Sequence, residues 1–140
     1  MNRRVLGQGR ALASIGAILM LIGCVLPWYT TSGVGLPPTS INAFDGPGIL
    51  VFVAAVGTIA LVLLPYAAGD QRLSLDRSLT FAVVAGVGAV GLLLRIIQQL
   101  GQYEPRGMFP DRALGLWLAA AGLALVAWGT AEIAKLDVRR

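Results

Sequence analysis

The chain has 140 residues, of which 56% are hydrophobic and 13% are charged, and its net charge is +4. An ordinary soluble domain is roughly 45 to 50% apolar and about 25% charged, and it needs polar groups to cover its surface. Eleven basic and seven acidic side chains are too few for that. The composition therefore argues against a soluble enzyme and predicts an all-α integral membrane protein.

The residue types that carry most metal and redox chemistry are scarce. The sequence has no histidine and one cysteine, Cys24, which excludes histidine-ligated metals, CxxC redox pairs and a disulfide within the chain. We therefore expect no catalytic residue, no metal site and no cofactor. The basic residues stand in ones and twos without forming a patch, so nucleic acid is not an expected partner.

Charged residues divide the chain into four apolar windows. Each window can hold a transmembrane helix, which needs about 20 mostly apolar residues. The predicted helices cover residues 9 to 28, 47 to 68, 78 to 100 and 113 to 134, all within a single domain of residues 1 to 140. The expected fold is a four-transmembrane-helix bundle surrounded by the lipid bilayer.

The first apolar window is longer than one span, and its second half, residues 29 to 44, is polar and uncharged. The alternation in residues 39 to 44 and the Gly33-Val34-Gly35 turn signal predict a small β-hairpin in this first outer loop. Asp45 is expected to be the N-cap of the second helix, with Pro47 in its first turn.

The distribution of positive charge predicts the orientation of the chain. Three basic residues, Arg95, Arg106 and Arg112, belong to one side. The other side carries eight: Arg3, Arg4, Arg10, Arg72, Arg77, Lys135, Arg139 and Arg140. Because lysine and arginine accumulate in cytoplasmic segments, we expect both termini in the cytoplasm and the chain in the plasma (inner) membrane of a bacterium.

Small residues mark the expected contacts between helices, since helices in lipid associate where their backbones can approach closely. These residues lie on the predicted second, third and fourth helices. They are Ala54, Gly57 and Ala60; Ala85, Gly88, Ala89 and Gly91; and Gly115, Ala119 and Gly122.

Arg95 is the most unusual residue, because arginine within a transmembrane segment is costly and usually functional. It shares a helical face with Gln98 and Gln99. This stripe predicts contact with an anionic lipid head group, a quinone-like ligand or an acidic residue of a partner. The alternatives are pairing with Asp45 or Glu104 within the chain, and snorkelling of the side chain toward the outer head groups.

Other candidate contacts with lipid or a partner lie at the ends of the predicted helices. Trp28 follows the first helix, where an aromatic belt would meet the outer interface, and Asp45 opens the second helix. Met108 and Phe109 lie in the second outer loop and are expected to dock on a partner or dip into the membrane surface.

Residues 21 to 24, Leu-Ile-Gly-Cys, fit the lipobox of bacterial lipoproteins and follow a basic segment and an apolar run. Processing there would leave Cys24 as a lipidated N-terminus. The alternative, which the continuing apolar segment after Cys24 favours, is a buried thiol within a transmembrane helix.

Three short motifs together carry a family resemblance. They are Gly16 to Trp28 with its Leu26-Pro27-Trp28 exit, Asp45-Gly46-Pro47-Gly48, and Gly115-Leu116-Trp117-Leu118. This pattern resembles the small four-helix membrane proteins of unknown function found in actinobacteria and related bacteria. The resemblance covers most of the chain and implies the same fold without implying an activity. The topology is also similar to that of claudin-like proteins, whose paired loop cysteines are absent here.

We therefore expect a non-enzymatic multi-pass membrane protein, an accessory or structural subunit that binds a membrane protein partner or forms a homo-oligomer. The alternative is a small channel or transporter that forms an oligomer with a polar outer mouth around Arg95. All seven acidic residues lie in or beside the polar segments, so proton-coupled transport has no visible proton site within the membrane.

Overall fold

A computed structural model describes residues 7–31, 35, 37, 39–67, 77–102 and 114–138. Four helices are each long and apolar enough to cross a bilayer, which confirms the four predicted helices. The elements are, in order, α1 (Gln8–Val25), β1 (Tyr29–Thr31), β2 (Thr39–Ile41), α2 (Ile49–Ala67), α3 (Arg77–Gln102) and α4 (Leu114–Val138).

The helix boundaries differ from the sequence prediction by one to four residues, and two of these differences have a local cause. Helix α1 ends at Val25, before residue 28, because Leu26 is extended (φ −72°, ψ 153°), as is favoured for a residue that precedes a proline. Helix α2 begins at Ile49. The prediction that Asp45 caps it is wrong, since an Asp45 carboxylate oxygen accepts a hydrogen bond from the backbone nitrogen of Asn42 instead (3.0 Å).

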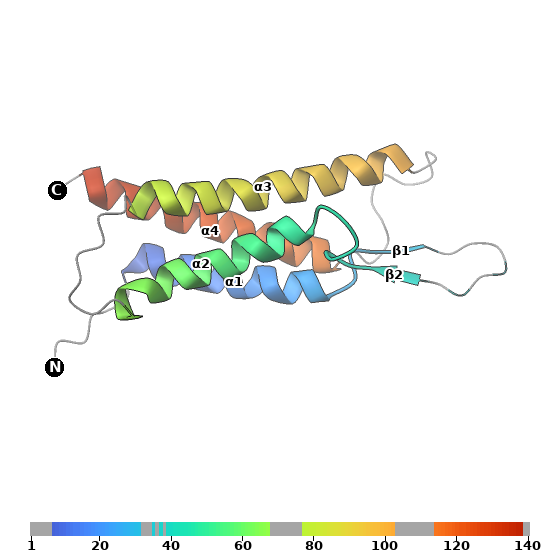
Figure 1. Cartoon of the computed structure of the whole chain (residues 1–140), viewed down its shortest axis with the longest axis horizontal. Helices are drawn as coiled ribbons and strands as arrows, with labels where there is room; N and C mark the ends of the chain where they lie inside the picture. Colours follow the sequence, from blue (N-terminus) through green and yellow to red (C-terminus); the bar gives the residue numbers. More distant parts are fainter. Residues whose placement is uncertain are drawn as a thin grey trace.

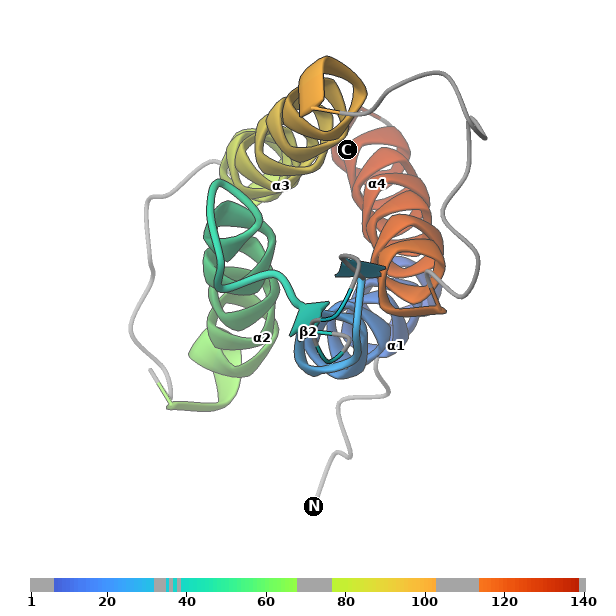
Figure 2. The ribbon, with the colours of Figure 1, turned by 90° about the vertical axis from the view of Figure 1, so that its right-hand side faces the viewer.

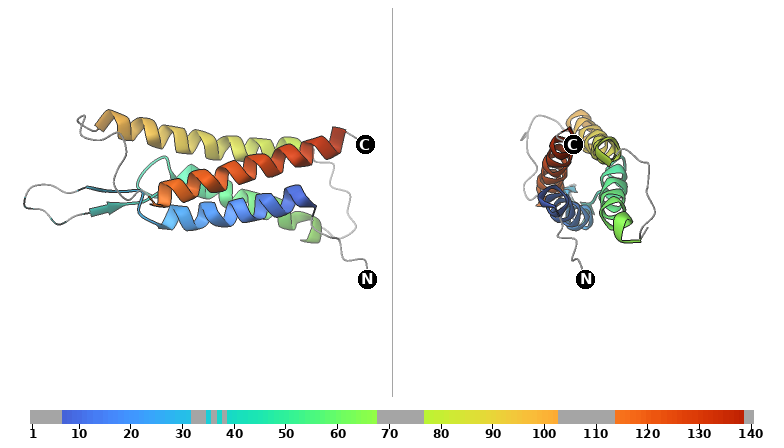
Figure 3. Two further views of the ribbon diagram at one scale, coloured as in Figure 1. Left: turned by 180° about the vertical axis from the view of Figure 1, so that it is seen from behind. Right: turned by 90° about the vertical axis from the view of Figure 1, so that its left-hand side faces the viewer.

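The four helices surround one core in the order α1, α2, α3, α4, and each packs against two neighbours (Figures 2 and 3). Helix α1 begins and helix α4 ends at the same end of the bundle (Figure 1). The two strands lie at the opposite end, which we call the hairpin end. Helix α3 extends farther toward the hairpin end than α2 does (Figure 1).

The two strands form the β-hairpin that the sequence predicts. They pair antiparallel, with Tyr29 opposite Ile41 and Thr30 opposite Ser40. The hairpin projects from the bundle beyond the ends of α1 and α4 (Figure 1). Of the predicted turn residues, Gly35 is described and has a φ of +83°, while Gly33 and Val34 lie outside the described residues.

Helices α1 and α4 pack closely along their whole length through glycines spaced seven residues apart on both. A Cβ atom on Gly23 would lie 2.6 Å from the backbone nitrogen of Ala119, closer than real Cβ atoms come. Glycine is therefore required for this approach of the two backbones. The facing pairs are Gly9 with Gly129, Gly16 with Gly122, and Gly23 with Gly115.

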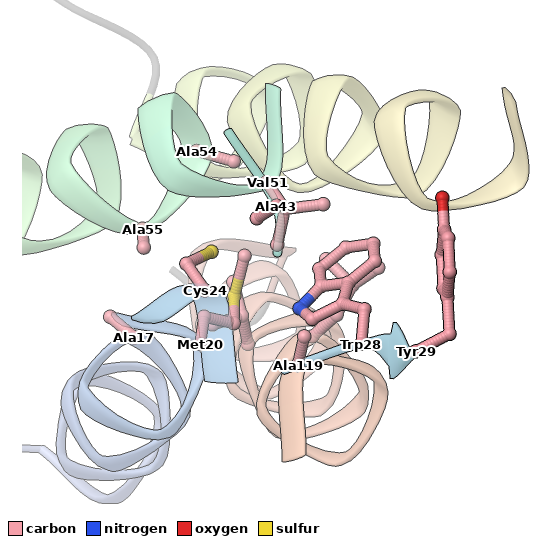
Figure 4. Packing of buried hydrophobic residues seen from close by; sticks show 12 residues of the cluster. Ala17, Met20, Cys24, Trp28, Tyr29, Ala43, Val51, Ala54, Ala55 and Ala119 are labelled. Atoms are coloured by element: carbon pink, nitrogen blue, oxygen red, sulfur yellow. The ribbon is translucent and has the colours of Figure 1, made fainter. Parts of the chain in front are cut away.

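All four helices meet around Gly88 of α3. A Cβ atom there would lie 3.0 Å from Ala54 of α2, 3.0 Å from Leu123 of α4 and 3.5 Å from Met20 of α1. Met20 is fully buried. The centre of the bundle therefore holds the flexible Met20 side chain, packed among alanines and larger buried apolar side chains (Figure 4).

Helices α2 and α3 also approach through glycine. A Cβ atom on Gly91 would lie 2.5 Å from that of Leu50, and one on Gly57 would lie 3.3 Å from Val84. These contacts, with those of Ala119 and Gly88, confirm most of the predicted small-residue contacts. Ala60 is exposed, so its predicted packing role is wrong.

Candidate functional site

Trp28 closes the hairpin end of the bundle. Its side chain has no exposed surface, and its Nε1 donates a hydrogen bond to the carbonyl oxygen of Gly23 (2.8 Å). The extended Leu26 and Pro27 turn the chain across the helix ends and carry the indole inward. The prediction that Trp28 contacts lipid or a partner is therefore wrong.

Ala43 enters the same end of the bundle two residues after β2 ends. It is fully buried, and its backbone nitrogen donates to the carbonyl oxygen of Cys24 (3.4 Å). Figure 4 shows Trp28 and Ala43 beside Cys24 and Met20. Cys24 is also fully buried and lies within α1, in agreement with the buried-thiol alternative.

The loop from residue 42 to residue 48 carries polar groups past α3. The backbone nitrogen of Phe44 donates to Asn42 Oδ1 (3.0 Å), and the Asp45 carboxylate accepts from the Asn42 nitrogen. These local bonds use the Asp45 side chain to shape the loop. They leave the Asp45 carbonyl oxygen turned toward α3.

Arg95 of α3 reaches this loop and strand β1. Its Nη1 donates to the Asp45 carbonyl oxygen (3.1 Å) and to Gln98 Oε1 (3.3 Å). Its Cζ lies 4.9 Å from the centre of the Tyr29 ring, which points from β1 toward α3 (Figure 4). Arg95 therefore joins three segments that are distant in the sequence.

The surroundings of Arg95 correct the sequence interpretation in two respects. Arg95 is 5% exposed, so its side chain packs against the chain and does not extend freely toward the outer head groups, as the snorkelling alternative requires. It pairs with Asp45 through the main-chain carbonyl oxygen, whereas the predicted partner was the carboxylate. Gly46 makes room for the contact, since a Cβ atom there would lie 2.8 Å from Arg95 Nη1.

The guanidinium is incompletely compensated by the residues that the structure describes. Among the described residues, its hydrogen-bond acceptors are two neutral oxygens, and no acidic side chain forms an ion pair with it. Its buried Nε has no hydrogen-bond partner. The negative face of the Tyr29 ring attracts the cation. A buried charge is costly unless it is paired and hydrogen-bonded, so this group marks the candidate site.

The other predicted site residues lie either on α3 and the neighbouring loop or outside the described residues. Gln98 and Asp45 are exposed and lie at the edge of the Arg95 site, while Gln99 is half-buried on α3. Met108 and Phe109 lie outside the described residues, as does Glu104. Within the described ranges, no three acidic, histidine or cysteine residues come together to hold a metal ion.

Two residues of the site, Tyr29 and Gly46, were missed by the sequence interpretation. The sequence places the neighbouring Trp28 at the outer interface and predicts no contact for Tyr29, which is 7% exposed. Gly46 was interpreted only as part of a helix start. The signal available in the sequence was Gly46 directly before Pro47, in a segment expected to lie near the same end of the bundle as Arg95.

Comparison of the chain with protein-family models, with curated proteins and with solved structures found no match. The function is therefore argued from the geometry of the bundle and of the Arg95 site.

Proposed function

We propose that the chain is a non-enzymatic multi-pass protein of a bacterial plasma membrane and acts as an accessory or structural subunit of a membrane assembly. The observation that carries this proposal is the apolar packing in the interior of the bundle. Met20 occupies the centre between all four helices, and Trp28 and Ala43 close the hairpin end. A protein with such an interior acts through its surface.

The buried polar groups support the same conclusion. Among the residues that the structure describes, the buried polar side chains are Thr58, Arg95 and Thr130. Each threonine hydroxyl donates to a carbonyl oxygen one turn earlier on its own helix, at 2.8 Å. The described interior thus offers a passing solute no free hydroxyl, and a conducting path would have to form between copies of the chain.

Helix α3 offers the surface on which a partner fits best. It has the smallest buried share of the four spans, and it extends beyond α2 toward the hairpin end (Figure 1). The large apolar side chains exposed along it are Leu79, Val83, Val87, Val90, Leu93, Leu94, Ile97 and Leu100. Lipid or a second membrane protein can cover this face.

The proposed orientation places both termini in the cytoplasm and the hairpin outside. The two terminal helices reach the same end of the bundle (Figure 1). Eight of the eleven basic residues lie in the two terminal segments of the sequence or between residues 68 and 77. These parts of the sequence adjoin the helix ends at that end of the bundle, as the positive-inside rule requires of the cytoplasmic side.

A photo-cross-linking amino acid at Ile97 tests the role of the α3 face. Ile97 is 63% exposed on α3, and Ile15 is 53% exposed on α1, so a probe at Ile15 is a matched control. We expect one adduct of defined mass from Ile97 in native membranes and none from Ile15. Equal labelling from both positions, or solute flux through liposomes that contain the purified chain alone, would contradict a subunit role.

A further inference from the structure

The guanidinium of Arg95 uses only part of its hydrogen-bonding capacity within the described chain. Arginine presents five N–H donors in a rigid planar fork. Both hydrogen bonds of Arg95 come from Nη1, and Nε is buried without a partner. The edge formed by Nε and Nη2 therefore remains, and this edge matches two oxygens of one phosphate or carboxylate group.

The charge around Arg95 points to an anion at that edge. The Asp45 and Gln98 oxygens that accept from Nη1 carry no formal charge, and the Asp45 carboxylate is held by the Asn42 nitrogen. Removing a cation from water costs several kcal/mol unless a counter-charge is present. An oxyanion would supply both the missing acceptors and the missing charge.

Arg95 itself is 5% exposed, and two of its neighbours on α3 face the surroundings of the bundle. Leu94 is 45% exposed, and Gln98 is exposed. Because Gln98 accepts from Arg95 through Oε1, its amide nitrogen remains a second donor beside the guanidinium. An anion approaching along the outer surface of α3 would meet the Gln98 amide, beside the buried edge of the guanidinium.

The height of Arg95 suits a phospholipid phosphate. Gly91 packs against the first turn of α2 at Leu50, and Arg95 lies one helical turn farther, by about 6 Å. This places the guanidinium level with the loop of residues 42 to 48, beyond the apolar part of α2. Phosphate groups lie at this level, just outside a hydrocarbon layer about 30 Å thick.

We infer that the Nε–Nη2 edge of Arg95, with the amide of Gln98, binds the oxygens of one phosphate group, from an anionic phospholipid or from free phosphate. The hairpin end of the bundle would thus hold a phosphate-binding site. This inference rests on the membrane location proposed above, and its test on the purified chain needs no partner at α3.

Binding to purified protein in detergent tests this inference. Native mass spectrometry measures binding of phosphatidylglycerol, with phosphatidylcholine as the uncharged comparison, and the thermal midpoint measures the effect of inorganic phosphate. We expect one phosphatidylglycerol per chain and weaker binding, by roughly tenfold, in Arg95→Lys, which keeps the charge and loses the planar edge. Arg10→Gln, which removes a cation at the other end of the bundle, should bind like the wild type.

The outcomes separate the sources of the phosphate. A midpoint that rises with inorganic phosphate in the wild type and stays constant in Arg95→Lys assigns the site to free phosphate. Binding of phosphatidylglycerol alone, with the same dependence on Arg95, assigns it to lipid. Equal binding of both probes by wild type and Arg95→Lys overturns the inference.

A carboxylate of the chain itself is the competing anion. If Glu104→Gln lowers the midpoint without ligand as much as Arg95→Gln does, then Glu104 fills the edge and the inference is overturned. Fractionation of cells tests the membrane location separately, because a chain found outside the membrane fraction refutes that location while the phosphate measurement still tests the Arg95 edge.

Discussion

Gly16 and Gly122 meet backbone to backbone, since a Cβ atom on either residue would lie 2.5 Å from the carbonyl oxygen of the other. The same relationship recurs one heptad away on both sides, at Gly9 with Gly129 and at Gly23 with Gly115. Helices α1 and α4 are therefore held together by close backbone packing over their full length. This pair supports the site at the hairpin end, because Gly23 also accepts the Trp28 indole hydrogen bond.

Replacing Gly16 with alanine should force α1 and α4 apart. The new methyl group would overlap the Gly122 carbonyl oxygen and the Val126 backbone, and overpacking of this kind costs about 1 to 3 kcal/mol. Gly86→Ala is the matched control, because Gly86 is an exposed helical glycine with nothing within 4 Å. That change should be neutral or stabilise the helix by up to about 1 kcal/mol. Circular dichroism in detergent measures the stability of both variants. Equal effects of Gly16→Ala and Gly86→Ala would contradict the close packing of α1 against α4.

Replacing Trp28 with phenylalanine should lower the free energy of unfolding by about 1 to 3 kcal/mol, because the buried carbonyl oxygen of Gly23 loses its donor. Trp128→Phe is the control, since Trp128 is 64% exposed and its replacement should change stability by about 0.5 kcal/mol or less. Fluorescence gives a second measurement. Acrylamide or brominated lipid should quench a variant that retains only Trp128 and should spare one that retains only Trp28.

Alanine at Gly46 should displace the Arg95 side chain. Gly46 has a φ of +152°, and its new Cβ atom would meet Arg95 Nη1. Backbone strain of this kind costs about 1 to 3 kcal/mol. Gly35→Ala measures backbone strain without a side-chain clash, because Gly35 has a φ of +83° and nothing within 4 Å. In a double-mutant cycle, Gly46→Ala should destabilise an Arg95→Gln background less than the wild type, and strict additivity would refute the contact.

Cysteine labelling in intact cells should report the orientation. Ser40 lies exposed on β2 and Leu136 lies exposed near the end of α4, so a cysteine at either position is accessible from one side of the membrane. Cys24 has no exposed surface and should stay unlabelled in the folded protein. Ser40→Cys should react with an impermeant maleimide from outside, and Leu136→Cys only after lysis. The reverse pattern would invert the proposed topology.

The spans and the hairpin could be predicted because they depend on local sequence. Long uncharged windows determine the four helices, and the alternating polar segment after Tyr29 determines the two strands. The pairing of α1 with α4 could have been predicted in part, since the seven-residue spacing of Gly9, Gly16 and Gly23 matches that of the glycines on α4. Spacing alone does not show which helices face each other, so the register required the structure.

The surroundings of Arg95 could not be predicted in the same way. The helical rise places Arg95 at the height of the head groups, but it does not show what covers the side chain. That cover comes from Tyr29 and from the Asp45 carbonyl oxygen, which is 50 residues away in the sequence. Pro27 and Gly46 bring these segments over α3 by turning the chain, and the effect of such turns on distant residues appears only in the folded bundle.

The mass of the chain as it is extracted gently from native membranes tests the proposed subunit role most directly. The account predicts a defined complex larger than the 14.6 kDa chain, formed with a membrane protein or with further copies, and loss of that complex when bulky polar residues replace Leu93 and Ile97. A monodisperse monomer that carries only lipid, under conditions that keep known membrane complexes intact, would contradict the account.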